Sequence, residues 1–392
     1  MKNVYLATAR RSAVGSFGGS LSGLAPTELG ATIAKATIEA IDLDPAAIGY
    51  SIFGQVMPTD AKDAYLSRVI ALNAGLPVSV PAVTVNRLCG SGMQSVIQAV
   101  QQVQLGEAEI VLAGGAEVMS RVPHQTQDIR WGTRMGNPQM VDMLLEGLKD
   151  PFHSYAMGVT AENVAEEYDV DRDTQDAYAL QSHQRASTAI REGRFADQII
   201  PVEVTQRRKT ITFAEDEHVR HDAQLDDFAK LRTVFKKDGT VTAGNASGIN
   251  DGAAALVVVS EQGLKDHNLT PLARFVSGGH AGVDPSVMGI GPVPASRQAL
   301  ERASLGVHDL SVIESNEAFA AQACAVANEL GFDPAKVNPN GSGISLGHPV
   351  GATGAIIVTK LVHEMQRISG QYGLATMCIG GGQGVASVWE RC

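Results

Sequence analysis

Two segments of different periodicity meet at Asn86-Arg87-Leu88-Cys89-Gly90-Ser91-Gly92. Residues 82–86 are rich in β-branched side chains and predict a strand, whereas residues 92–105 have the apolar spacing of a helix. Cys89 is therefore expected at or near a helix N-terminus, where the positive end of the helix dipole favours a thiolate. Taken by itself, such a cysteine is more often a buried small hydrophobe than a nucleophile.

The C-terminal part of the chain repeats this order of elements. Residues 310–314 predict a strand and residues 320–330 predict a helix. The motif Asn316 to Phe319 stands between them, where Cys89 stands in the first unit. We therefore expect an internal duplication of an α/β unit, with the two helix N-termini meeting near one site.

Glycine turns are predicted to end a strand in both units. Residues 110–113 predict a strand that leads into a turn at Gly114-Gly115, and residues 374–379 predict one that leads into Gly380-Gly381-Gly382. Strands that alternate with helices favour largely parallel sheets covered by helices. The pattern therefore predicts an α/β fold built from two similar halves.

A more polar segment separates the two units and is predicted to form a lid over a site. Its helical patterns cover residues 162–168 and 173–192, and Asp171 is a favoured N-cap for the second. The predicted division of the chain is a first half of residues 1–117 with 250–270, a lid of residues 118–249, and a second half of residues 271–392.

The composition is that of an ordinary globular protein, since 44% of the 392 residues are hydrophobic and 19% are charged. The net charge of −11 argues against nucleic acid or an anionic membrane surface as a partner. We find no apolar run of the ~18 residues that a membrane span needs, and no apolar core of a signal peptide. Four scattered cysteines without metal-ligand spacing predict free thiols, no metal site and a cytoplasmic location.

Cys89, His348 and Cys378 together predict acyl transfer through a thioester. A thiolate is the nucleophile in such chemistry, so Cys89 needs a base such as His348, while a second thiol can move a proton on the substrate. The flanking glycines allow backbone N–H groups to approach a developing oxyanion. Taken singly, His348 is also consistent with a structural histidine beside Pro349, and Cys378 with a core cysteine at a strand end.

Seven short motifs extend along the chain in a fixed order. They are Asn86 to Gly92, Ala113 to Ser120, Met157 to Asn163, Gly244 to Gly252, Asn316 to Ala320, Gly347 to Pro349, and Cys378 to Gly382. In this order they resemble the thiolases (acetyl-CoA acyltransferases) over essentially the whole chain, and most closely the bacterial broad-range β-ketothiolases. The resemblance implies the thiolase fold, in which duplicated mixed-sheet α/β halves form a layered αβαβα arrangement with an inserted lid or loop domain.

The same resemblance implies a role for each reactive group. The first cysteine of a thiolase takes the acyl group, which implies that Cys89 is the nucleophile and that His348 activates it. Cys378 corresponds to the acid/base that acts on the second acyl-CoA. One oxyanion site is implied at His348 and a water held by Asn316, and another at the backbone N–H groups of Cys89 and Gly380.

Coenzyme A carries phosphates, so an acidic protein needs a local basic patch to bind it. By resemblance, Arg220 and Ser247 match coenzyme A contacts, and Phe235 is predicted to stack on the adenine. Asp227 stands where relatives often have Ser, which disfavours a phosphate nearby. The lid holds a run of basic residues, which is also consistent with a solvated charged face: Arg207, Arg208, Lys209, Arg220, His221, Lys230, Arg232, Lys236 and Lys237.

Acyl-chain selection is expected to depend on apolar side chains near the thiols, although such residues are equally consistent with plain core. Many relatives have His at the position of Ala156, where it touches the bound acyl or pantetheine region. Its absence predicts a larger or less polar pocket that tolerates longer 3-ketoacyl chains. The other residues expected along the acyl chain are Leu148, Met157, Met288 and Phe319.

The expected activity is reversible: thiolysis of a 3-ketoacyl-CoA by coenzyme A, and Claisen condensation of an acyl-CoA with acetyl-CoA through a cysteine acyl-enzyme. The expected ligands are acetyl-CoA, acyl-CoA and 3-ketoacyl-CoA, without a tightly bound cofactor, and the resemblance implies a homodimer or homotetramer. Three alternatives stay open: a strict acetoacetyl-CoA thiolase, a ketosynthase-type enzyme that uses a carrier protein, and a non-catalytic subunit. Ketosynthases have His at the place of Cys378 and lack this lid, and a non-catalytic subunit is expected to lose Cys89, His348 or Cys378.

Overall fold

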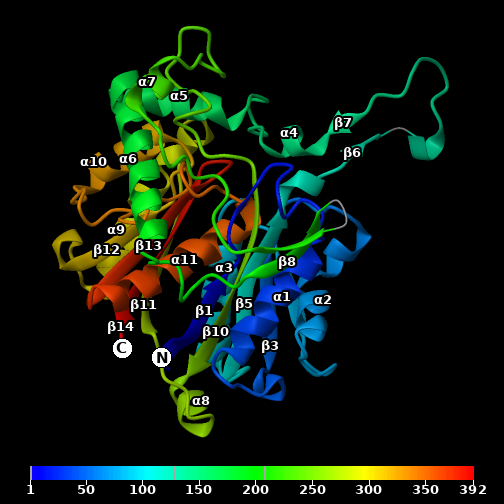
Figure 1. Cartoon of the computed structure of the whole chain (residues 1–392), viewed down its shortest axis with the longest axis vertical. Helices are drawn as coiled ribbons and strands as arrows, with labels where there is room; N and C mark the ends of the chain where they lie inside the picture. Colours follow the sequence, from blue (N-terminus) through cyan, green and yellow to red (C-terminus); the bar gives the residue numbers. More distant parts are fainter. Residues whose placement is uncertain (1, 128, 207–208) are drawn as a thin grey trace.

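The computed structural model describes residues 2–127, 129–206 and 209–392 (Figure 1). Its central feature is a ten-stranded mixed sheet in the order β12-β13-β14-β11-β1-β10-β5-β3-β4, with the short β2 paired to β10. The strands are β1 (Val4–Arg11), β2 (Gly15–Ser16), β3 (Tyr50–Gly54), β4 (Ala82–Val85), β5 (Ile110–Val118), β10 (Asn250–Ser260), β11 (Ala273–Gly282), β12 (Leu310–Ser315), β13 (Tyr372–Ile379) and β14 (Gln383–Arg391).

The sheet consists of two halves with the same order of pairing, joined where β1 pairs antiparallel with β11. In the first half, β1, β10 and β5 are antiparallel neighbours, and β3 and β4 continue in parallel. In the second half, β11, β14 and β13 are antiparallel neighbours, and β12 continues in parallel. Val337 forms a parallel bridge with Ile313 of β12, at the place that β4 occupies in the first half. The predicted duplication is therefore present.

The correspondence between the halves differs from the one that the sequence predicted. Cys89 follows β4 and precedes α3 (Ser91–Leu105), and its counterpart is His348, which follows the Val337 bridge and precedes α11 (Val350–Arg367). Asn316 instead follows β12, the counterpart of β3. The long irregular segment between Val337 and α11 has no periodicity to reveal this relationship.

A second prediction was wrong in detail, because Gly114 and Gly115 do not form a turn. They lie in the middle of β5, which continues to Val118. A Cβ atom at Gly115 would lie 2.3 Å from the carbonyl oxygen of Gly351 at the start of α11. Glycine is needed here so that the helix can approach the strand closely.

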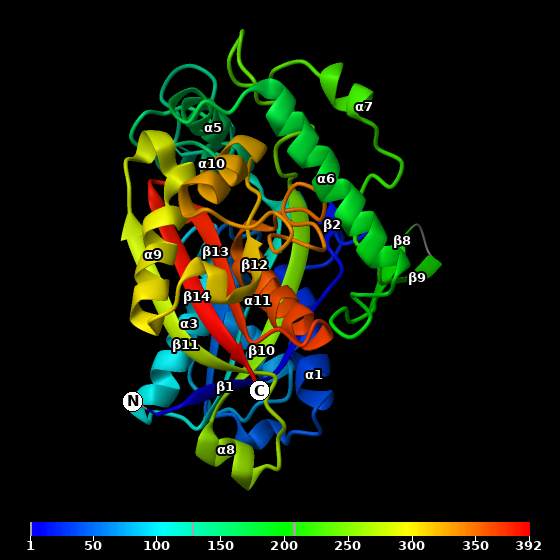
Figure 2. The same ribbon diagram turned by 90° about the vertical axis from the view of Figure 1, so that its left-hand side faces the viewer.

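The helices complete the predicted αβαβα layers (Figures 1 and 2). Helices α3 and α11 pack against each other between the two halves of the sheet, as Figure 1 shows at the centre of the molecule. The outer face of the first half is covered by α1 (Pro26–Glu39) and α2 (Leu66–Asn73), and that of the second half by α9 (Pro292–Ala303) and α10 (Ala320–Leu330). A short helix, α8 (Glu261–Asp266), follows β10.

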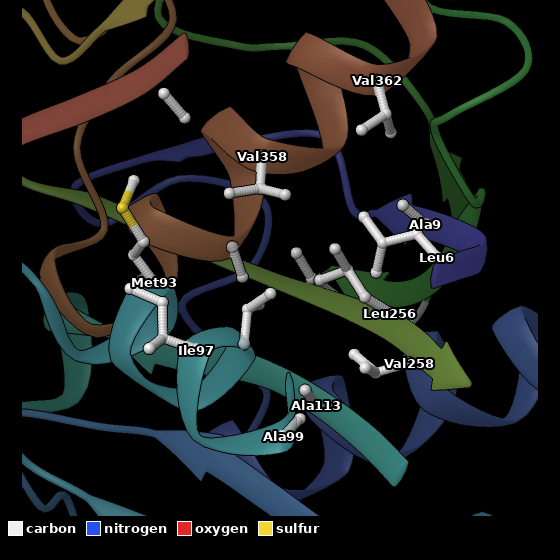
Figure 3. Packing of buried hydrophobic residues seen from close by; sticks show 14 of the residues in the cluster. Leu6, Ala9, Met93, Ile97, Ala99, Ala113, Leu256, Val258, Val358 and Val362 are labelled. Atoms are coloured by element: carbon white, nitrogen blue, oxygen red, sulfur yellow. The ribbon is translucent and has the colours of Figure 1, made fainter. Parts of the chain in front are cut away.

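Close contact between the two central helices brings their N-termini together. A Cβ atom at Gly354 of α11 would lie 2.2 Å from the backbone nitrogen of Met93, and one at Gly92 of α3 would lie 2.7 Å from that of Ala355. Beyond this crossing, apolar side chains of both helices pack with those of β1, β5 and β10 (Figure 3). Burial of these side chains supplies the main stabilisation of the domain.

The lid extends over the end of the sheet where β13 finishes (Figure 2). Its first long helix begins at Met157 rather than at the predicted residue 162, and the side chain of Asp171 caps the second, as predicted. Arg207 and Arg208 of the predicted basic run lie outside the described residues. The lid elements are β6 (His124–Gln125), β7 (Val141–Asp142), α4 (Met143–Gly147), α5 (Met157–Glu167), α6 (Arg172–Arg191), β8 (Val202–Gln206), β9 (Lys209–Phe213) and α7 (Leu225–Ala229).

None of the helices in the described ranges combines the length and the apolar character of a membrane span.

The helix crossing can be tested by Gly354→Ala. We expect this substitution to destabilise the protein by about 1–3 kcal/mol, because the added methyl group meets backbone atoms that cannot move aside, although alanine by itself favours a helix. Gly23→Ala is the matched control, since a Cβ atom there has no neighbour within 4 Å. Urea unfolding of both variants measures the effect, and wild-type stability of Gly354→Ala would contradict the close contact.

Candidate active site

The turn that carries Cys89 is held by hydrogen bonds from the side chains of two of its own residues, Asn86 and Ser91. The side chain of Asn86 accepts from the backbone N–H of Leu88 (3.0 Å) and donates to the carbonyl of Val56 (3.1 Å). Ser91 Oγ accepts from the Arg87 N–H (2.8 Å) and donates to the Leu88 carbonyl (2.7 Å). These bonds hold Leu88 at a φ of +48°, a strained value for a non-glycine residue. The turn is therefore rigid around the thiol.

The Cys89 thiol is half-buried, and burial raises its pKa. Backbone N–H groups of Gly380 and of Cys89 itself donate to the sulfur and lower the pKa, whereas the nearby Glu117 carboxyl raises it. The net shift is upward, because desolvation of the thiol outweighs these two hydrogen bonds. The thiol therefore needs a base to become nucleophilic.

His348 is the candidate for this base, and its side chain is buried. Its backbone N–H donates to Asn250 Oδ1 (2.9 Å), and its Nδ1 lies 2.7 Å from Thr353 Oγ1. Nε2 has no hydrogen-bond partner in the described part of the chain. Burial lowers the pKa of the imidazole to about 4, which keeps the ring neutral at pH 7.

Cys378 and Asn316 lie at adjacent strand ends in the second half. The parallel register of β12 and β13 pairs Ser315 with Thr376, which places Asn316 beside the end of β13, where Cys378 lies. Burial and the neighbouring Cys89 raise the pKa of the Cys378 thiol far above its usual range. The side-chain amide of Asn316 is buried, and neither of its polar atoms has a partner among the described residues. An amide in this state is suited to bind a water or a polar substrate atom.

Glu117 connects the loop after β3 to the first turn of α11, a function that its motif alone did not indicate. Its carboxylate is fully buried and accepts three backbone N–H groups, from Val56 (2.8 Å), Met57 (3.1 Å) and Gly351 (2.9 Å). Burial raises its pKa to about 8, although the three hydrogen bonds lower it. The available signal in the sequence was a single charged residue in the otherwise uncharged run of residues 110–118.

The residues predicted to select the acyl chain lie in two apolar clusters next to the thiols. Leu148 and Cys89 pack in one cluster, and Met157 and Phe319 pack around buried Met288 and Cys378 in the other. Sequence reasoning missed two methionines of the first cluster, Met57 and Met119. Nothing in the spacing of these two side chains indicated that they would lie near the site.

Gly380 and Ala156 lie where these clusters meet. A Cβ atom at Gly380 would lie 3.4 Å from Met157 and 3.5 Å from Leu88. Ala156 is the N-cap residue of α5 and bridges to Lys149, while the N–H of Met157 donates to the carbonyl of Leu148 (3.0 Å). Ala156 is thus held between two residues predicted to contact the acyl chain.

Two of the three residues predicted to bind coenzyme A adjoin these clusters. Ser247 donates its backbone N–H to the carbonyl of Ala318 (2.9 Å), next to Phe319. Phe235 packs edge-to-face on Phe319, with 6.3 Å between ring centroids, which places it beside the acyl-chain residues. Arg220 is exposed on the lid, and its backbone N–H donates to His183 Nδ1 (3.1 Å).

Comparison with known sequences and structures gives a consistent result. The thiolase N-terminal domain matches residues 4–262 and the thiolase C-terminal domain matches residues 269–391. The chain is 57% identical to beta-ketothiolase BktB of Cupriavidus necator, covering 100% of this chain and 99% of that protein. It is 50% identical to an acetyl-CoA acetyltransferase of Chromobacterium violaceum, covering 99% of both.

Solved structures agree with these matches. Human mitochondrial 3-ketoacyl-CoA thiolase superimposes with a TM-score of 0.98 at 43% identity, covering 100% of this chain and 99% of that one. The acetyl-CoA acetyltransferase of Bacillus anthracis superimposes with a TM-score of 0.97 at 44% identity and the same coverage. Since the two domain matches together cover nearly the whole chain, the protein belongs to the thiolase family.

Proposed function

We propose that this acyltransferase is a broad-range β-ketothiolase that uses Cys89, His348, Cys378 and Asn316 as its catalytic groups. The proposal is supported by two thiols close enough for Cys89 to raise the pKa of Cys378, and by a buried imidazole Nε2 and a buried amide that have no partner among the described residues. In the proposed reaction coenzyme A is a substrate. The other groups that take part are side chains and backbone N–H groups of the protein and one water.

In the first half-reaction, His348 Nε2 takes the proton of the Cys89 thiol, and the sulfur attacks the 3-keto carbon of the substrate. The tetrahedral oxyanion lies where the N–H groups of Cys89 and Gly380 already donate to the sulfur region. The bond between C2 and C3 then breaks, which leaves an acyl-Cys89 and the enolate of acetyl-CoA. His348 and a water on Asn316 stabilise the enolate, and Cys378 supplies the proton that completes acetyl-CoA.

In the second half-reaction, coenzyme A replaces acetyl-CoA and gives its thiol proton to the Cys378 thiolate. Its sulfur attacks the acyl-Cys89 carbonyl, and a shortened acyl-CoA leaves. The Cys89 thiolate recovers its proton from the His348 imidazolium. Both thiols are then neutral again, as their raised pKa values favour, and the reverse sequence is the Claisen condensation.

We further propose that coenzyme A lies between the lid and the second half, with Arg220, Ser247 and Phe235 as contacts. The contact of Ser247 with Ala318 and of Phe235 with Phe319 supports this placement. A human thiolase of the same fold has been solved in complex with CoA. The adenine-stacking role of Phe235 stays a prediction, since its ring packs on Phe319.

A homodimer or homotetramer and a cytoplasmic location complete the proposal. The edge strand β4 ends the sheet with Val83 exposed, and an arm of the lid carries Trp131 (90% exposed) and Met135 (92% exposed) (Figure 1). Exposed apolar groups of this size are typical of subunit contacts. All four cysteines are free, which fits a reducing compartment.

The separate roles of Cys89 and Cys378 can be tested by incubating variants with acetyl-CoA and measuring the intact mass of the protein. Cys89→Ser is expected to form no acetyl-enzyme, because the hydroxyl is a far weaker nucleophile. Cys378→Ser is expected to form it, because a thiolate leaves without a proton, yet to lose turnover by about 10³-fold or more. Acetylation of Cys89→Ser, or wild-type turnover of Cys378→Ser, would contradict the assignment.

The lowered pKa of His348 predicts an unusual pH profile for acylation by acetyl-CoA. Because the imidazole stays neutral down to about pH 4, the acid limb is expected well below pH 6.5. The same shift means that the unfolded chain binds this proton first, so stability should fall as pH drops from about 6.5 toward 4. The rate of acylation is measured by rapid quench between pH 5 and 8, with circular dichroism at each pH as the folding control. An acid limb near pH 6.5 would contradict a buried neutral base.

The substrate range can be tested at Ala156. Wild-type enzyme is expected to cleave five- and six-carbon 3-ketoacyl-CoA at rates comparable with acetoacetyl-CoA, and Ala156→His is expected to lower kcat/KM for the longer substrates. An Ala156→Ser variant, which adds little volume, is the control. Cleavage of acetoacetyl-CoA alone would favour the second candidate, a strict acetoacetyl-CoA thiolase, which the 47–50% identity to several acetyl-CoA acetyltransferases also supports.

A further inference from the structure

One buried hydroxyl, that of Thr353, hydrogen-bonds the His348 ring. Thr353 lies in the first turn of α11, and its side chain is 2% exposed. Its Oγ1 lies 2.7 Å from His348 Nδ1 and 2.8 Å from the carbonyl oxygen of Pro349. The three residues therefore form a short chain of hydrogen bonds at the helix N-terminus.

The chemistry of this chain determines which nitrogen of His348 carries the proton. A hydroxyl has one proton to donate, and a carbonyl oxygen can only accept, so the Thr353 proton is used in the bond to Pro349. Toward His348 the hydroxyl can then only accept, which requires a proton on Nδ1. Nε2 is left with a lone pair, and it is the ring nitrogen without a partner among the described residues.

We propose that Thr353 is a positioning residue that holds His348 in the Nδ1–H tautomer, so that Nε2 is free to accept the Cys89 proton. The inference rests on the proposed function, in which His348 is the base. A hydroxyl suits this task because it orients the ring without adding charge. A carboxylate in its place would stabilise the imidazolium and keep the proton on the ring.

Helix α11 also supplies a matched control. Thr359 is buried in the same helix, and its hydroxyl donates to the Ala355 carbonyl (2.9 Å), four residues earlier, as Thr353 donates to Pro349. The two threonines thus share burial and local geometry, and only Thr353 contacts His348. A difference between them isolates the contact with the imidazole.

The experiment measures acylation of Cys89 by acetyl-CoA in Thr353→Val and Thr359→Val. We expect a loss of about 10–100-fold for Thr353→Val, little change for Thr359→Val, and recovery of most of the rate in Thr353→Ser, which keeps the hydroxyl. Equal rates in wild type and folded Thr353→Val would overturn the proposal, as would equal losses in both valine variants.

A double-mutant cycle separates this inference from the proposed function. In a His348→Ala background, Thr353→Val should cause no further loss, because Thr353 acts through the ring; an undiminished loss there would overturn the positioning role. A wild-type rate of His348→Ala would instead refute His348 as the base. Should Thr353→Val fail to fold, ¹⁵N NMR of histidine-labelled wild-type enzyme decides, with His348→Ala identifying the signals: a protonated Nδ1 supports the proposal and a protonated Nε2 overturns it.

Discussion

The Glu117 carboxylate is the contact on which the rest of the site depends. It accepts N–H groups from the loop after β3 and from the first turn of α11, so one side chain joins the first half of the sheet to a helix of the second half. The loop after β3 in turn accepts a hydrogen bond from Asn86, which shapes the Cys89 turn. A buried carboxylate is costly unless its oxygens are hydrogen-bonded, and here three backbone donors offset part of that cost. The Cys89 turn and the first turn of α11, beside His348, are thereby both linked to Glu117 through hydrogen bonds.

Burial explains how the site can contain three reactive groups and little charge. Desolvation moves each pKa toward the neutral form, upward for Cys89 and Cys378 and downward for His348. In the proposed mechanism, Cys89 therefore loses its proton only when the substrate has bound. The backbone N–H groups of Cys89 and Gly380 then give the oxyanion the stabilisation that water would otherwise give. The same desolvation keeps both thiols protonated, so they are weak nucleophiles until a base acts on them.

Local sequence patterns were sufficient for part of this description. The strand and helix around Cys89, the N-cap at Asp171 and the layered α/β fold could all be predicted, because each depends on periodicity, on nearby residues or on motifs of a known family. The equivalent positions of His348 and Cys89 in the two halves could not, since residues 338–349 have no regular pattern. Nor could Gly115 be recognised as a strand residue, because its role is set by a carbonyl oxygen more than two hundred positions away. These features depend on long-range contacts and on desolvation, which local sequence patterns do not show.

The duplication gives the two central helices different tasks at equivalent positions. The turn before α3 holds a half-buried thiol and directs its own N–H toward the sulfur, whereas the turn before α11 holds a fully buried imidazole. At α11 the N–H of Gly351 donates to Glu117, so this backbone donor at the helix end is satisfied. An uncapped N-terminus beside His348 would disfavour the imidazolium that forms when Cys89 is deprotonated. The carboxyl group of Glu117 thus joins the helix turn beside the proposed base to the half that carries the proposed nucleophile.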